Sequence, residues 1–146
     1  MTYPFTIFVL ATTPEGTRAA LRAANRRAQG RCNILLLVPC LTARPDPSGA
    51  ADSPAALIDQ YHRLAREVCP AAVVYVIVCA QPEDAFRQFL TGPATVLIGG
   101  HRGVWWRPTV ERRLARRLSR QGHLVVFEDL GRLNERVPSA GASVRV

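Results

Sequence analysis

The chain has 146 residues, of which 48% are hydrophobic and 21% charged, so we expect one globular domain and exclude a disordered protein. The formal net charge is +8, and every one of the 19 basic residues is an arginine. Solvated arginines on the surface are enough to explain this charge, but it is also compatible with an anionic partner. No segment resembles a signal peptide or reaches the about 20 apolar residues of a membrane helix, so we expect a cytoplasmic protein with no membrane partner.

Five apolar runs predict strands, because they are continuous rather than alternating, as in strands covered on both faces. In chain order they are Phe5–Ala11, Asn33–Val38, Ala71–Cys79, Ala94–Ile98 and His123–Phe127. Apolar residues at helical spacing predict helices from Pro14 to Gln29, from Ser53-Pro54 to Pro70, from Pro82 to Leu90 and from Pro108 to Gln121. This alternation predicts a single open, doubly wound parallel α/β sheet of five strands, with helices on both faces. We place the domain at residues 1–130 and expect 131–146 to form an edge strand or a disordered tail.

Two strand-end loops are the candidate ligand site, because doubly wound sheets bind ligands where the winding reverses. They are LATTPEGT after the first run and IGGHRGVWWRP after the fourth. Neither carries a P-loop or a Rossmann glycine motif, and the carboxylates and lysine of a phosphoacceptor domain are missing. The second loop has a G-x-x-G, from Gly100 through His101 and Arg102 to Gly103, whose glycines would let backbone N–H groups face a phosphate.

This G-x-x-G and the order of elements resemble the universal stress proteins, over Phe5 to Phe127. The resemblance implies the strand order 3-2-1-4-5. In nucleotide-binding members it also implies an aspartate after the first strand and, separated from the G-x-x-G by nine residues, a G-[ST]. Here Thr12 occupies the aspartate position, and Arg113-Leu114 replaces the G-[ST]. The resemblance therefore implies a non-catalytic regulatory or binding protein whose ATP site is partly lost.

Two other functions stay open. One is a functional ATP- or AMP-binding protein that grips the anion with arginines, and the other is a basic module for a protein or nucleic-acid partner. No catalytic constellation or metal cluster is visible in the sequence. The candidate cofactor-binding residues are Thr12, Gly100, Arg102, Gly103 and Arg113.

Further expectations concern partners. The last strand, His123–Phe127, is an apolar edge candidate and is commonly the dimer contact in the resembling family, so we expect a homodimer through it. Five arginines lie on the last predicted helix, but without a helix-turn-helix pattern we do not expect sequence-specific nucleic-acid binding. Trp105 and Trp106 either pack around their loop, or one of them stacks on a base or contacts a partner subunit.

The predicted strands place the four cysteines near strand ends, where they could approach one another in pairs. If the second and third strands are neighbours, as in the resembling family, Cys32 approaches Cys69 and Cys40 approaches Cys79. The pairs are then either separate thiols or cross-strand disulfides.

Overall fold

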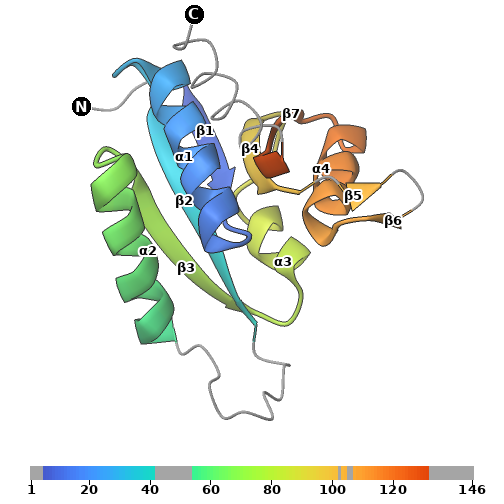
Figure 1. Ribbon diagram of the computed structural model, residues 1–146, viewed down its shortest axis with the longest axis horizontal. Coiled ribbons are helices and arrows are strands. Elements are labelled where there is room, and N and C mark those ends of the chain that lie inside the picture. Colours follow the sequence, from blue (N-terminus) through green and yellow to red (C-terminus); the bar gives the residue numbers. More distant parts are fainter. Residues whose placement is uncertain (1–4, 42–53, 102, 105–106, 132–146) are drawn as a thin grey trace, which may run out of the picture.

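The computed structural model describes residues 5–41, 54–101, 103–104 and 107–131. Its main sheet has five parallel strands in the order β3-β2-β1-β4-β7 (Figure 1). Their bounds are β1 Thr6–Leu10, β2 Asn33–Leu41, β3 Val73–Cys79, β4 Thr95–Gly100 and β7 Leu124–Asp129. Since β7 is the fifth strand of this sheet along the chain, the expected order 3-2-1-4-5 is confirmed.

Helices cover both faces of the sheet, as expected. The helices of the described ranges are α1 Pro14–Ala28, α2 Pro54–Val68, α3 Pro82–Arg87 and α4 Val110–Arg120. Buried residues of α1 and α2 share one hydrophobic cluster, and buried residues of α3 and α4 share the other. None of these helices is long and apolar enough to cross a membrane.

The central strand β1 explains the continuous apolar pattern. Val9 and Leu10 are both fully buried, but they belong to the clusters on opposite faces of the sheet. On one face α1 presents the fully buried alanines Ala20 and Ala24, whose small side chains let the helix lie close to the strands. The helix ends after Ala28, at the C-cap residue Gln29, whose left-handed backbone (φ 48°) stops the helix before Gly30.

The loop after β4 differs from the prediction. We expected a helix from Pro108, but Arg107–Pro108 form the short strand β6, which pairs antiparallel with β5, Gly103–Val104. Helix α4 therefore begins at Val110, and the β5–β6 hairpin projects beyond it (Figure 1). The last strand also extends to Asp129, beyond the expected Phe127, because it pairs with β4 as far as Gly100. Residues 132–146, most of the expected tail, lie outside the described residues.

None of the four cysteines is in a disulfide in this structure. In the β2–β3 register Cys40 is opposite Val78, and Cys79 is opposite Leu41. Because successive side chains of a strand alternate between faces, the two cysteines belong to the clusters on opposite faces of the sheet. A Cys40–Cys79 bridge is therefore excluded by the register.

Cys69 is expected to resist alkylation in the folded protein. It is fully buried, and burial raises the pKa of its thiol from 9.0, against smaller opposing effects of backbone hydrogen bonds from Ala72 and Ala71. Its contribution to stability is therefore full below pH 9.0, the unfolded value, and is lost as the pH rises through the folded pKa. Because the thiolate is the nucleophile, iodoacetamide should modify Cys69 at least about tenfold more slowly in the native protein than in the guanidinium-unfolded chain. Mass spectrometry of timed samples measures both rates, and equal rates would contradict the burial of Cys69.

Candidate functional site

Thr12 follows β1 and Gly100 ends β4, so both lie at the carboxyl edge of adjacent strands, where the winding reverses. The Thr12 hydroxyl donates a hydrogen bond of 2.6 Å to the carbonyl oxygen of Gly99. The Thr12 backbone N–H donates to the Thr17 hydroxyl at 3.0 Å. The hydroxyl that would face a ribose is thus engaged with the neighbouring strand.

Gly16 and Gly99 bring the backbones of α1 and β4 into direct contact at this edge. A Cβ atom added to Gly99 would lie 1.9 Å from the carbonyl oxygen of Gly16, and one added to Gly16 would lie 2.3 Å from that of Gly99. Neither glycine was among the predicted site residues. A signal was present, since a glycine in the first turn of a helix lowers helix stability and indicates a close approach there.

Glu111 lies over Gly100. A Cβ atom on Gly100 would be 2.7 Å from Cγ and 3.2 Å from Cδ of Glu111, in the first turn of α4. A phosphate placed at Gly100 would therefore meet a carboxylate of its own charge. No sequence signal indicated this contact, because an acidic residue in the first turn of a helix is common and reflects the helix dipole.

The left-handed backbone of Gly103 is explained by its place in the β5–β6 hairpin. Its φ is 70°, and an added Cβ would lie 2.6 Å from the Arg107 carbonyl oxygen. Gly103 pairs with Pro108 across the hairpin. The second glycine of the G-x-x-G is thus needed for its left-handed backbone and for the close pairing of β5 with β6, independently of any ligand.

Thr109 caps α4 at the position where an anion would approach the helix. Its hydroxyl accepts a 3.2 Å hydrogen bond from the N–H of Arg112 and donates to the carbonyl oxygen of His101. The cap therefore already satisfies one of the N–H groups of the first turn.

The described arginines of this region do not converge on the strand ends. Arg113 is exposed and donates to the Pro108 carbonyl oxygen at 3.4 Å. The Arg112 guanidinium lies 5.4 Å from the centre of the Phe127 ring and covers β7. Of the predicted site residues, Arg102 lies outside the described ranges, as do Trp105 and Trp106.

Comparison with known proteins identifies no family. No protein-family description and no curated protein matches the chain. Among solved structures, the chain is similar to protein Rv1636 from Mycobacterium tuberculosis H37Rv, with 16% identity, 82% of this chain and 92% of that chain covered, and a TM-score of 0.44. At this distance the similarity assigns no function to the chain.

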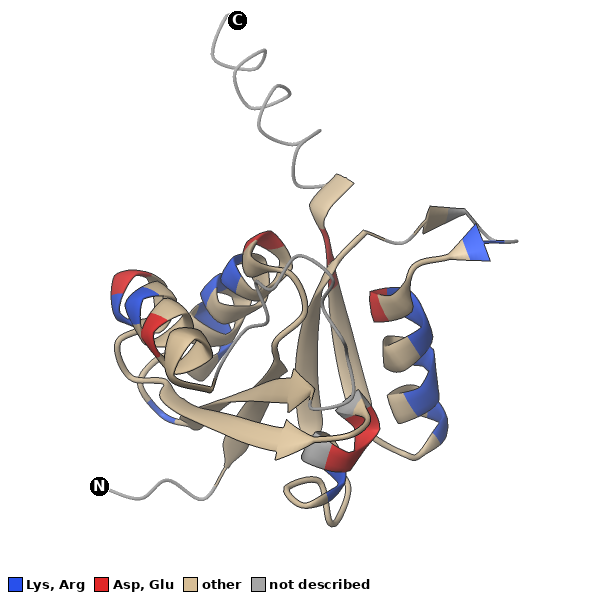
Figure 2. Cartoon of the chain, turned by 90° about the horizontal axis from the view of Figure 1, so that it is seen from below, with Lys and Arg blue, Asp and Glu red and all other residues tan. Residues whose placement is uncertain are grey.

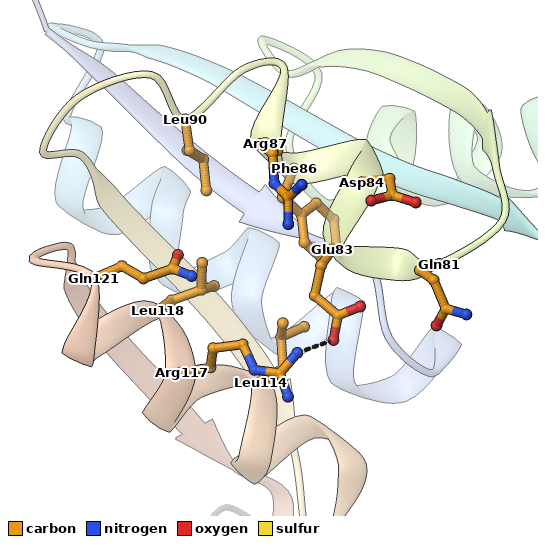
Figure 3. A pocket seen from close by; sticks show the side chains of 10 residues that line it. All are labelled: Gln81, Glu83, Asp84, Phe86, Arg87, Leu90, Leu114, Arg117, Leu118 and Gln121. Carbon is orange, nitrogen blue, oxygen red and sulfur yellow. Dashed lines mark hydrogen bonds and ion pairs between the residues drawn. The ribbon is translucent and has the colours of Figure 1, made fainter.

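Two cavities lined by described residues lie away from the strand-end site. One, of about 370 Å³, opens between α3 and α4 over Phe86, Leu114 and Leu118, and the Glu83–Arg117 ion pair joins the two helices beside it (Figure 3). The other, of about 770 Å³, lies at the opposite edge of the sheet, around the amino ends of β1 and β4. Neither lining includes Thr12 or Gly100. Within the described residues, no group of three His, Cys, Asp or Glu side chains is placed to hold a metal ion.

Proposed function

We propose that this chain is a non-catalytic binding protein of the universal stress type whose nucleotide site is closed by the chain itself. The observation that carries the proposal is the packing at the carboxyl ends of β1 and β4. There the backbone of Gly16 contacts that of Gly99, with an added Cβ only 1.9 Å from an oxygen atom. Interiors packed this closely have no space for a ligand group without a shift of the backbone.

Electrostatics support the same conclusion. The side chain of Glu111 lies against Gly100, where the G-x-x-G would present its N–H groups to a phosphate. A nucleotide would have to displace a carboxylate and compete with the Thr109 cap. The alternative arginine grip would need Arg112 to leave Phe127.

We expect no binding of ATP at about 1 mM, measured as heat by titration calorimetry and as a shift of the melting temperature. The measurement is sensitive, because a ligand present at 100 times its Kd stabilises the folded state by about 2.7 kcal/mol. Saturable heat, or adenine nucleotide released from the purified protein on denaturation, would overturn the proposal and favour a functional nucleotide-binding protein. The variant Glu111→Ala should be measured in the same way, because it removes the carboxylate but keeps the contact between the backbones. It should also fail to bind, because the contact between Gly16 and Gly99 remains.

The homodimer through the last strand stays a proposal. Strand β7 is the terminal strand of the described sheet beyond β4, and Leu124 at its start is 65% exposed. An edge strand offers backbone groups to a second copy of the chain, which supports this contact.

A further inference from the structure

The outward face of α4 is a row of arginines. Arg113, Arg116, Arg117 and Arg120 are exposed. Arg116 and Arg117 lie three and four residues after Arg113, and four and three before Arg120, so all four lie on one face of the helix. Figure 2 shows these basic positions along the side of α4 that points away from the sheet. The opposite side is apolar, with Ala115 and Leu118 buried in the core.

Three of these side chains form what we call the arginine stripe: Arg113, Arg116 and Arg120. The fourth, Arg117, is neutralised by its ion pair with Glu83 of α3. Arg113 makes a weak hydrogen bond to a backbone carbonyl, and in the described part of the chain Arg116 and Arg120 form no ion pair. The only acidic residue of α4 is Glu111, which lies on Gly100. The stripe therefore carries uncompensated positive charge.

The other helical face also carries arginines, but on that face acidic residues of α2 lie beside them. Arg22, Arg26 and Arg27 of α1 are also exposed. Beside them Arg18 is paired with Glu67 of α2 at 2.9 Å, and α2 carries both acidic and basic residues along its length (Figure 2). Helix α1 itself has one acidic residue, Glu15, in its first turn. Net charge alone does not distinguish the two faces, so a comparison of variants on each face is needed.

We propose that the arginine stripe binds the phosphate backbone of a nucleic-acid duplex, independently of base sequence. From Arg113 to Arg120 the helix rises by seven steps of 1.5 Å, or about 10 Å. Over that distance one DNA strand presents about three phosphates, one per 3.4 Å of duplex axis. Guanidinium groups suit phosphates because two N–H groups bind two oxygens in one plane. This interaction goes beyond the proposed function, since it involves neither Gly100 nor Glu111.

The composition of the face favours nucleic acid over a membrane. A helix that binds lipid directs apolar side chains into the bilayer, but the apolar residues Ala115 and Leu118 face the sheet. Between Arg113 and Arg120 the remaining exposed residue is Ser119, and the one exposed large apolar side chain of α4 is Val110 at its first residue. A single valine gives little apolar surface to insert. Phosphate contact without base reading also agrees with the absence of a recognition motif.

Fluorescence anisotropy with two labelled DNA duplexes of unrelated sequence tests the proposal. We expect the wild-type chain to bind both with Kd values within about threefold, and the affinity to fall steeply between about 50 and 200 mM salt. The triple variant Arg113→Gln/Arg116→Gln/Arg120→Gln should bind at least about tenfold more weakly, and the slope of log K against log salt should fall by about 3.

The matched control removes the same charge from the other face. Arg22→Gln/Arg26→Gln/Arg27→Gln should keep the wild-type affinity within about threefold. An equal loss in both triple variants would overturn the site on α4, because total charge would then explain the binding. Absence of salt-dependent binding by the wild type would also overturn it, as would binding to phosphatidylserine vesicles but not to DNA. Circular dichroism and melting curves show that each variant is folded.

Discussion

Replacement of Gly99 by alanine is expected to lower the free energy of unfolding by about 3 kcal/mol or more, an effect at the upper end of those seen when a packed interior is overfilled. The new methyl group would lie 1.9 Å from the carbonyl oxygen of Gly16, and 3.0 Å from its Cα atom. Both atoms belong to the backbone, so no side chain can rotate to make room, and α1 would have to move off β4. Urea denaturation of the purified variant measures the change.

Gly92→Ala is the matched control for this substitution. A Cβ atom there meets nothing within 4 Å, and Gly92 is not among the residues with positive φ. We expect a change of at most about 0.5 kcal/mol, because surface substitutions away from special contacts have small effects. If Gly99→Ala is as stable as Gly92→Ala, the contact between α1 and β4 is not as close as described, and the closed nucleotide site loses its main support.

The second large effect is expected at Thr17, a fully buried polar residue of α1. Its hydroxyl accepts from the N–H of Thr12 at 3.0 Å and donates to the carbonyl oxygen of Thr13 at 2.7 Å. Thr17→Val keeps the branched shape of the side chain but leaves the Thr12 N–H without this acceptor. Loss of a partner for a buried polar group costs about 1–3 kcal/mol, so we expect destabilisation of about 2 kcal/mol in urea or thermal denaturation.

The variant Thr17→Ser distinguishes the contribution of the hydroxyl to stability from that of the methyl group. It retains both hydrogen bonds and loses one buried methyl group, which predicts a smaller cost of about 1 kcal/mol. The order of stability should therefore be wild type, then serine, then valine. A valine variant more stable than the serine variant would show that packing, and not the hydrogen bonds, is what Thr17 contributes.

Much of the fold could be predicted because burial on two faces leaves a continuous apolar pattern. In β1 the fully buried Val9 and Leu10 belong to different clusters, so the residues from Ile7 to Ala11 are all apolar. The ends of elements were less accurate. The β5–β6 hairpin was missed because a pairing of two residues with two leaves no periodic signal, and the left-handed Gly103 that permits it was interpreted as part of a phosphate loop.

Local patterns predicted the succession of strands and helices along the chain and the positions of Thr12 and Gly100 at strand ends. The atoms that lie against these two residues depend on tertiary contacts, which local patterns do not contain. Gly16 meets Gly99, and Glu111 meets Gly100, across elements that are distant in the chain or joined by an unpredicted hairpin. A glycine in a sequence indicates that space or backbone freedom is needed, but not which neighbour uses it. Here the neighbours are the backbone of α1 and a carboxyl side chain of α4, and both glycines of the G-x-x-G lie against the protein's own atoms.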